Sequence, residues 1–403
     1  MGKSKLLGSV LIVMGTTIGG GVLALPITTG FMGFFPSMVL FTCCWLVMLL
    51  SAFCFLDVNL SFKMPVNLIS MTQVLLGRFA KGICFVIYLF LLYSLVSAYL
   101  SGSVTLFVDF FSRALHLNIS KFVASLCLPA LFCVFIYLGT KGVDFINRIL
   151  MLGLFVSFAL LVSFIPEFVE GERLLHMDVK SFGIALPLVI TSFGYHIVIP
   201  SLVTYVHHDR ALLKKAIIIG SVSPLILYII WQALVMGAVP LSGNVSLASA
   251  WVKGESVTVA LSKIIHRPEV AVIGQFAVFF AIITSFLGVT MSLSDFVTDG
   301  FKLKRNTMGR FFSMLIALIP PLIFTAVSAR GFIAALEYAG AFVAILLIFF
   351  PALLAWKLPR KAGYHTPLKR LMLIGLMAFA VFVVAVDILV ETGFFKSTMQ
   401  VYL

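Results

Sequence analysis

Charged side chains are scarce in this sequence, at 11% of 403 residues, whereas a soluble domain carries about a quarter. Hydrophobic residues make up 62% of the chain, and 40 residues are phenylalanine. Too few polar side chains remain to cover a surface that faces water. The composition therefore excludes a soluble protein and indicates an all-α polytopic membrane protein embedded in a lipid bilayer.

The motifs of several functional classes are also missing. No nucleotide-binding P-loop occurs, which argues against a primary pump, and no ring of charges or filter-like repeat indicates a channel. A multi-pass membrane enzyme stays a remote alternative, because no HExxH or DxxD pattern occurs and the adjacent His207 and His208 point to different helix faces. A secondary transporter, which needs no metal and no cofactor, is the class that these absences favour.

Apolar runs near or above the roughly 20 residues that cross a bilayer recur along the whole chain. We expect one transmembrane transporter domain, residues 1–403, and between its spans we expect a cytoplasmic surface helix within 57–81. The external segment 241–268 is either a short helical cap or an ordinary loop. The eleven predicted transmembrane helices are 5–32, 34–56, 82–110, 121–139, 145–166, 181–206, 215–240, 269–298, 309–328, 332–355 and 370–391.

The positions of lysine and arginine predict the orientation. With the N-terminus in the cytoplasm, most of the 28 basic residues fall in cytoplasmic segments, as the positive-inside rule requires. An odd number of spans then puts the C-terminus on the periplasmic side. The net charge of +13 is explained by this basic rim beside anionic lipid, so no nucleic-acid partner is needed.

Two of the spans share an unusual pattern. The first contains GTTIGGGVLALP and the sixth contains TSFGYHIVIPSLVTY, and in each a glycine is followed six positions later by a proline. The residues that align at a constant offset are Thr17 with Thr191, Gly20 with Gly194, and Pro26 with Pro200. A chance match between two apolar helices is the alternative explanation.

The positions of these two spans in the chain indicate an internal repeat. They open two halves of five spans each, 5–166 and 181–355, and the helix at 370–391 is extra. Because five is odd, the second half enters the membrane from the opposite side. The pattern therefore predicts a 5+5 inverted repeat with discontinuous helices 1 and 6, which is where secondary transporters bind their substrates.

Three consecutive glycines inside a span predict a break in the helix, since each costs about 1 kcal/mol relative to alanine. The start of a half-helix offers unpaired N–H groups to a carboxylate, and the end of one offers carbonyl groups to an ammonium. A zwitterionic amino acid satisfies both, although a notch for helix packing is the alternative. The candidate substrate-binding residues are Thr16, Thr17, Gly19, Gly20 and Gly21 in the first break and Phe193, Gly194, Tyr195 and His196 in the second.

Other spans offer further polar candidates. Tyr93 and Ser97, four residues apart on the third span, share a helix face, and we assign them to the same pocket. A polar stripe on the eighth span, expected to line the interior, consists of Thr284, Gly288, Ser292 and Asp295. The candidates for handling the coupling ion are Glu337, His196, Asp295 and Thr284, with structural ion pairs and a satisfied buried histidine as the alternatives.

The stretches GTTIGGGVLALP, TSFGYHIVIPSLVTY, LLYSLVSAYLSG and YAGAFVAILL resemble the bacterial aromatic (hydroxy/aromatic) amino acid permeases, most of all the tyrosine-specific ones. The resemblance implies a LeuT-like fold and import of an aromatic amino acid, tyrosine first, through the bacterial inner membrane. It implies cation symport by alternating access, with a proton as the expected ion. It also attaches substrate contacts to Thr17, Gly19–Gly21 and Phe193–His196.

The resemblance leaves several points open. Tryptophan, phenylalanine, or serine and threonine are alternative substrates. Sodium is an alternative coupling ion, because the fifth span has no lysine in its core where some proton-coupled relatives carry one in place of sodium. Glu337 stands where the family pattern has a small or uncharged residue, so a shared role as proton carrier does not follow.

Overall fold

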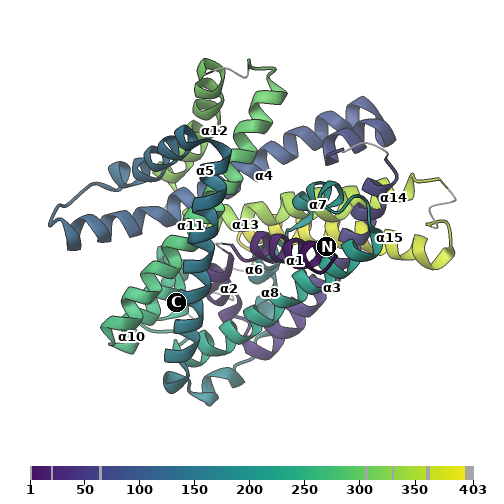
Figure 1. Cartoon of the computed structure of the whole chain (residues 1–403). Coiled ribbons are helices and arrows are strands. Elements are labelled where there is room, and N and C mark those ends of the chain that lie inside the picture. Colours follow the sequence, from purple (N-terminus) through teal and green to yellow (C-terminus); the bar gives the residue numbers. More distant parts are fainter. Residues whose placement is uncertain are drawn as a thin grey trace.

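The chain is all-helical over the residues described by its computed structural model, which are 2–19, 21–62, 66–304, 307–328, 331–359 and 364–394. Within these ranges, the side chains of 2–4, 113, 114, 133–147, 268, 307 and 310 are not described. Figure 1 shows long helices packed side by side, with the two parts of the first span near the centre.

The helices of the first half follow the predicted apolar runs. The run at 5–32 forms two helices, α1 and α2, that meet at a bend of 50°. The bounds are α1 Gly2–Thr17, α2 Gly21–Gly30, α3 Phe34–Leu60, α4 Leu68–Ala114 and α5 Lys121–Phe164.

The second half begins after three short 3-10 turns between Pro166 and Ser181. Its tenth predicted span is one continuous element in which α13 passes through a π-helical turn, Ala344–Phe349, into α14. The bounds are α6 Phe182–Ser192, α7 Ile199–Tyr205, α8 Arg210–Ala238, α9 Leu247–Lys253, α10 Val257–Ile265, α11 Pro268–Gly300, α12 Thr307–Val327, α13 Gly331–Val343, α14 Phe350–Trp356 and α15 Pro367–Glu391.

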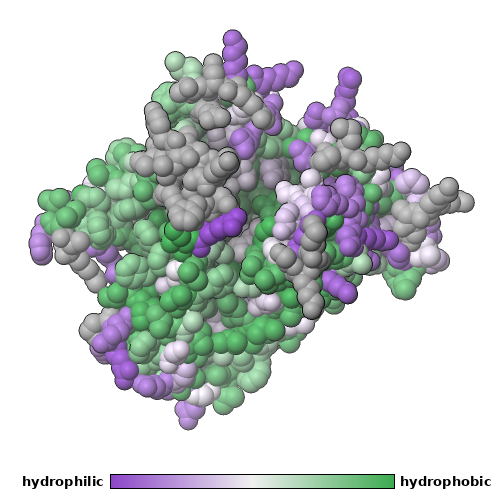
Figure 2. Space-filling view, viewed as in Figure 1, coloured by the Kyte–Doolittle hydropathy of each residue, from purple (hydrophilic) through white to green (hydrophobic). Residues whose placement is uncertain are grey.

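The lengths and apolar character of these helices make the chain a polytopic membrane protein. Among the described residues, seven helical segments are long and apolar enough to cross a bilayer, and the bent pair α1–α2 makes an eighth. Three shorter apolar helices, Lys121–Phe132, Arg148–Phe164 and Phe311–Val327, coincide with the remaining predicted spans. Large continuous areas of the surface are hydrophobic, and the hydrophilic side chains gather in separate groups (Figure 2).

Two stretches can be compared in detail with the sequence-based prediction. Within 57–81, α3 continues to Leu60, and the helix that begins at Leu68 is interrupted at Gly77, where φ is +90°, so a short helical segment at 68–76 precedes the third span. Its place on the cytoplasmic surface stays a prediction. The predicted spans 121–139 and 145–166, in contrast, both fall on α5, whose backbone is helical over 44 residues and ends at Phe164. The loop expected between them falls in 133–147, where side chains are not described.

Segment 241–268, predicted to be external, contains two short helices, as expected of a helical cap rather than an ordinary loop. α9 and α10 are separated at Gly254, which adopts the left-handed conformation at the end of α9. Both helices pack against α2. Leu247 lies against Gly30, and Trp251 meets the ring of Phe31 edge-on with 5.9 Å between centroids.

Contacts between the two halves place the broken helices in the middle of the molecule. α1 packs against α8 and α2 packs against α6, while α13 packs against both α4 and α6. Every residue of α2 is buried. The first broken helix is therefore held by elements that lie about 200 residues away in the sequence, which positions the site described next.

Candidate functional site

The first break in the helix lies at the glycine run, as the sequence predicts, between the end of α1 at Thr17 and the start of α2 at Gly21. After α1 ends at Thr17, the Ile18 N–H donates to Met14 O (2.9 Å) and the Val22 N–H donates to Gly19 O (3.3 Å). The hydroxyls of Thr16 and Thr17 donate back into α1, to the carbonyl oxygens of Ile12 (2.8 Å) and Val13 (2.7 Å). The backbone of Thr17, rather than its side chain, is thus the polar group that faces the break. Gly20 lies outside the described residues.

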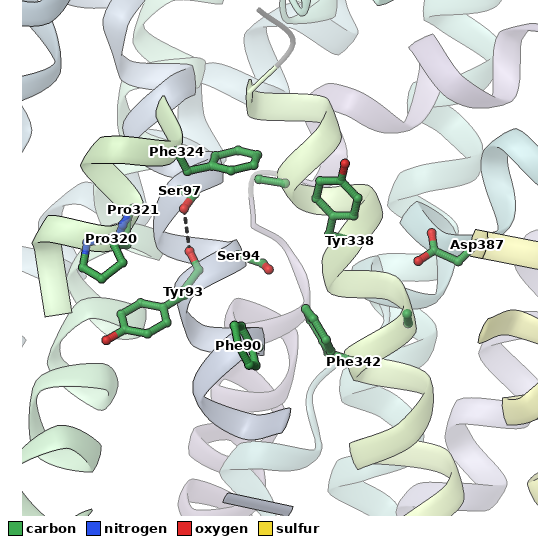
Figure 3. A pocket seen from close by; sticks show the side chains of 12 residues that line it. Phe90, Tyr93, Ser94, Ser97, Pro320, Pro321, Phe324, Tyr338, Phe342 and Asp387 are labelled. Carbon is green, nitrogen blue, oxygen red and sulfur yellow. Dashed lines mark hydrogen bonds between the residues drawn. The ribbon is translucent and has the colours of Figure 1, made fainter. Parts of the chain in front are cut away.

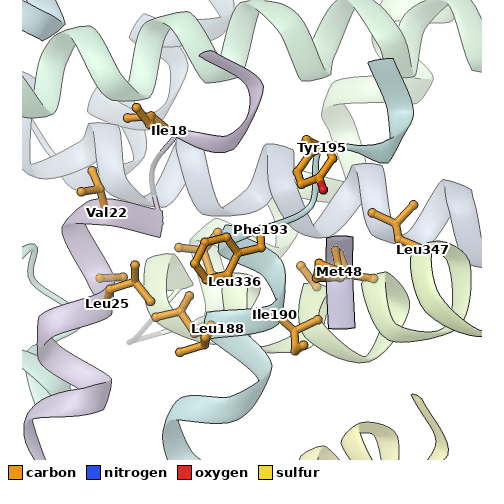
Figure 4. Close-up of a cluster of buried hydrophobic side chains, with 14 of the residues drawn as sticks. Ile18, Val22, Leu25, Met48, Leu188, Ile190, Phe193, Tyr195, Leu336 and Leu347 are labelled. Atoms are coloured by element: carbon orange, nitrogen blue, oxygen red, sulfur yellow. The ribbon is translucent and has the colours of Figure 1, made fainter. Parts of the chain in front are cut away.

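The second break also lies where the sequence predicts. α6 ends at Ser192, Phe193–Tyr195 are not helical, and the chain turns through a 3-10 turn, His196–Val198, into α7. Pro200 in the first turn of α7 needs no backbone hydrogen bond there. Figure 4 shows the two breaks on either side of one buried cluster, with Ile18 and Val22 on the first and Phe193 on the second.

One hydroxyl group joins the two breaks. Tyr228 on α8 directs its hydroxyl to Thr17 O (2.7 Å) at the end of α1 and to Ser192 O (3.2 Å) at the end of α6. A tyrosine has one hydroxyl proton, so the two carbonyl groups share it. The ends of two half-helices, which carry partial negative charge, therefore meet at one point.

The helices approach closely at this point because one contact residue is glycine. A Cβ atom at Gly21 would overlap the hydroxyl of Ser192. The phenyl ring of Phe193, fully buried, meets the Tyr228 ring (5.5 Å between centroids) and the Phe41 ring (6.4 Å) edge-on. The residues brought together here are Thr17, Gly21, Phe193 and two that the sequence analysis did not select, Ser192 and Tyr228.

Hydroxyl groups also gather beside Gly19. A Cβ atom at Gly19 would lie 3.1 Å from Ser285 Oγ and 3.8 Å from the Tyr99 hydroxyl. Thr284, the neighbour of Ser285 on α11, is buried and donates to Phe280 O (2.7 Å). The first break therefore lies next to hydroxyl oxygens from α4 and α11.

His196 and Tyr195 are buried polar side chains at the second break. Both are fully buried, and their rings stack with 5.2 Å between centroids. Neither ring nitrogen of His196 has a hydrogen-bond partner among the described residues. The Tyr195 hydroxyl lies beside Ser221 but makes no hydrogen bond of normal geometry to any described residue. A buried polar group left without a partner costs about 1–3 kcal/mol, so this arrangement has unused capacity for a polar ligand.

Gly194, in the second break, lies next to the tenth predicted span. A Cβ atom there would lie 3.5 Å from Leu347 and 3.9 Å from Val343, at the π-helical turn after α13. Glu337, also on α13, is 2% exposed and follows Leu336, whose carbonyl oxygen accepts a hydrogen bond from the Thr191 hydroxyl (3.3 Å). The tenth predicted span thus packs on the second break, and Glu337 lies one residue from that contact.

Tyr93 and Ser97 lie together but apart from the breaks. The Ser97 hydroxyl donates to Tyr93 O (2.8 Å), and both residues line a cavity of about 410 Å³ between α4, α12, α13 and α15 (Figure 3). The Tyr93 hydroxyl donates to Ile316 O on α12 (2.9 Å). The residues of the two breaks are not among those that line this cavity.

The polar stripe on α11 leaves the interior after its first member. Thr284 is buried, whereas Gly288, Ser292 and Asp295 are exposed. The Ser292 hydroxyl donates to Gly288 O (2.9 Å) within the same helix. A role for Asp295 in ion coupling stays a prediction.

Three polar or aromatic residues on α8 contact the first broken helix but were not selected in the sequence analysis, although their spacing was a local signal. Tyr228 lies three positions before Trp231 and four before Gln232, so the three share one helix face. The Trp231 indole N–H donates to Val22 O (2.9 Å), and the Gln232 amide donates to the Thr29 hydroxyl. With the Tyr228 contact, this face of α8 holds the first broken helix from Thr17 to Thr29.

Comparison with known proteins shows to which family the chain belongs. The tryptophan/tyrosine permease family matches residues 2–392, which is nearly the whole chain. The chain belongs to the tryptophan/tyrosine permease family. As a family member it is a transport protein for aromatic amino acids and not an enzyme, which confirms the family resemblance seen in its motifs.

Individual relatives divide between two substrates. A tryptophan-specific transport protein of Haemophilus influenzae is 33% identical over 366 residues, 87% of each chain. The tyrosine-specific transport system 1 of the same organism is 30% identical over 398 residues, 97% of this chain and 98% of the relative. The low affinity tryptophan permease of Escherichia coli is 27% identical over 371 residues, 89% of this chain and 88% of the relative. The similarity to tryptophan and tyrosine permeases is thus of the same order.

Proposed function

We propose that this permease is a secondary active symporter that imports tyrosine through a bacterial inner membrane, coupled to protons, by alternating access. The observation that carries the proposal is the Tyr228 hydroxyl shared by Thr17 O and Ser192 O. It supports a single substrate site at which both broken helices end. The proposed frame is a LeuT-like 5+5 inverted repeat with eleven spans, a cytoplasmic N-terminus and a periplasmic C-terminus.

The proposed binding mode follows from the polarity of the half-helices. The substrate carboxylate faces the start of α2 at Gly19–Gly21, where unpaired N–H groups and the positive end of the helix dipole favour an anion. The ammonium group takes the carbonyl groups of Thr17 and Ser192, which one hydroxyl proton satisfies only in part. Both charges of a zwitterion are then neutralised without a charged side chain.

The substrate ring lies against the second break in this proposal. Phe193 and Tyr195 provide apolar and aromatic contact area for the ring. His196 forms a hydrogen bond with the phenolic hydroxyl of the substrate through a ring nitrogen that has no partner among the described residues. Tyrosine fits this arrangement because it alone among tyrosine, tryptophan and phenylalanine carries that hydroxyl. Tryptophan is the alternative, supported by the names of two of the three relatives above.

The coupling ion has two candidate locations. Glu337, His196 and Asp295 are the proposed proton carriers, and the burial of Glu337 beside the contact with α6 favours it as a residue whose charge state changes during transport. A sodium ion is favoured instead by the hydroxyl oxygens of Ser285 and Tyr99 next to Gly19 and by the neighbouring Thr284, since hard cations prefer oxygen ligands.

Uptake by purified protein in proteoliposomes tests this function. Labelled tyrosine, tryptophan and phenylalanine are offered separately under an inward proton gradient, an inward sodium gradient or neither. We expect tyrosine to accumulate under the proton gradient alone and protonophore to abolish the accumulation. Preferred accumulation of tryptophan would overturn the substrate assignment, and accumulation under sodium alone would overturn the proton assignment. Lack of accumulation of any of the three would overturn the function itself.

A further inference from the structure

The cavity between α4, α12, α13 and α15 is lined by aromatic residues and one acid that have no role in the proposed transport site. Its volume of about 410 Å³ falls within the range of small-molecule sites. Five of its twelve lining residues are aromatic, and one carboxylate faces it. These aromatic and acidic lining residues are Phe90, Tyr93, Phe324, Tyr338, Phe342 and Asp387.

The carboxylate is unusual for its position in the fold. Asp387 is 7% exposed and lies on α15, four residues from the end of the helix. Among the described residues, no side chain donates a hydrogen bond to it, and its electrostatic neighbour is another acid, Glu391. A buried carboxylate without a counter-charge is costly in apolar surroundings, so this end of the cavity favours a cation.

The rings are arranged for the same kind of ligand. Phe90 of α4 and Phe342 of α13 stack with 5.9 Å between centroids and an interplanar angle of 20°. Figure 3 shows this pair at the bottom of the cavity, Tyr338 above it and Asp387 to the right of both. Aromatic faces attract ammonium groups and bury the apolar part of an amine. A carboxylate beside several rings is thus suited to an organic ammonium ion.

We propose that this cavity is a second binding site, separate from the two breaks, for a primary ammonium group carried on an apolar or aromatic body. The Asp387 carboxylate accepts hydrogen bonds from the ammonium group, and the rings of Phe90, Phe342 and Tyr338 cover the body of the ligand. A soluble arylalkylamine and the headgroup of phosphatidylethanolamine both supply this chemistry. A ligand without a carboxylate is not held at the breaks, where the start of α2 requires an anion.

Direct binding of labelled phenethylamine to the full chain in nanodiscs tests the proposal. In phosphatidylglycerol nanodiscs, which hold no ammonium lipid, we expect saturable binding that excess tyrosine does not displace. Asp387→Asn should weaken it at least tenfold. The matched control is Glu269→Gln, which removes an exposed acid in the first turn of α11 that does not line the cavity, and it should change the affinity less than twofold. Tyrosine uptake by Asp387→Asn, retained because Asp387 is outside the proposed transport site, shows that the variant is folded.

A second variant keeps the test decisive if Asp387→Asn fails to fold. Phe342→Leu removes one ring face while keeping apolar volume, and it should weaken phenethylamine binding about threefold. Absence of saturable binding, equal binding by both variants and wild type, or displacement by tyrosine would each overturn the proposal. Repeating the titration with phosphatidylethanolamine present identifies the source: weaker amine binding supports the lipid headgroup as occupant, and unchanged binding supports a soluble amine.

Discussion

The hydroxyl of Tyr228 lies 2.7 Å from the carbonyl oxygen of Thr17, although 211 residues separate the two in the sequence. The same hydroxyl lies 3.2 Å from Ser192 O, so a single donor from α8 holds the ends of α1 and α6 together. An ammonium group carries three donors and satisfies these acceptors better than one hydroxyl does. In the proposed binding mode, this contact marks the position that the substrate's amino group takes.

Replacing this donor should weaken transport without removing the fold. Tyr228→Phe keeps the ring contacts with Phe41 and Phe193 but leaves Thr17 O and Ser192 O without their shared donor. We expect uptake at low tyrosine concentration to fall about tenfold, or about 1.4 kcal/mol, because the two half-helix ends lose their alignment. Initial uptake rates in proteoliposomes measure this.

The control for Tyr228→Phe is a tyrosine outside the site. Tyr205→Phe, at the partly exposed end of α7, should leave the rate within twofold of wild type. Equal rates for Tyr228→Phe and Tyr205→Phe would mean that the shared hydroxyl has no part in transport.

A side chain at the close contact between the breaks should block the site. Gly21→Ala places a Cβ atom against the Ser192 hydroxyl, so the hydroxyl must rotate away, or the start of α2 and the end of α6 must move apart. We expect uptake to fall below one tenth of wild type with unchanged membrane insertion. Gly375→Ala on α15, where a Cβ atom meets nothing within 4 Å, is the matched control. Full activity of Gly21→Ala would contradict a substrate site at this contact.

His196 should affect selectivity more than overall rate. His196→Ala removes the ring whose nitrogens have no partner among the described residues. Because phenylalanine has no hydroxyl to lose, we expect the ratio of tyrosine uptake to phenylalanine uptake to fall at least fivefold. Competition between the two labelled substrates in one vesicle preparation measures the ratio. An unchanged ratio would remove His196 from substrate recognition.

The hydrogen bond of Tyr364, a residue between the spanning helices α14 and α15, predicts a pH effect on stability. The Tyr364 hydroxyl donates to Asp57 (2.8 Å), which also pairs with Arg210 (2.6 Å). Burial, together with nearby Cys54 and Asp57, raises the pKa of Tyr364 above its ordinary value of 10. The stability that neutral Tyr364 supplies is thus fully present below pH 10 and is lost as the pH rises toward the folded-state pKa.

Thermal unfolding in detergent from pH 7 to pH 11 measures this effect. Tyr364→Phe should be less stable than wild type at pH 7, by about 2 kcal/mol, because a hydrogen bond to a charged acceptor is lost. The difference between the two melting temperatures should narrow above pH 10. A constant difference across the whole range would show that the pKa of Tyr364 is the same in the folded and the unfolded protein, and would contradict the raised pKa.

The sequence predicted the helices well where membrane insertion alone determines them. The sixth span was placed at 181–206 and the structure has a segment at Val179–Tyr205, because an apolar run of fixed length crosses a bilayer. Both breaks were predicted because glycine and proline act locally on the backbone. The continuous backbone of α5 and the π-helical turn after α13 were not predicted, because neither leaves a signal in hydropathy.

The site was predictable only in its local parts. Tyr93 and Ser97 do share a face, as their spacing indicated, but helix spacing does not reveal which neighbours that face meets, and it lines a cavity apart from the breaks. The role of Tyr228 depends on a contact across 211 residues. The partners of Gly19 and Gly21, Ser285 and Ser192, likewise follow from tertiary packing.

A cryo-electron microscopy structure of the permease in nanodiscs with saturating tyrosine tests the central claim most directly. The account predicts density for one tyrosine with its carboxylate at Gly19–Gly21 and its amino group within 3.5 Å of the carbonyl oxygens of Thr17 and Ser192, in place of the Tyr228 hydroxyl. Density for tyrosine only in the cavity beside Phe342, with the Tyr228 contacts unchanged, would contradict it.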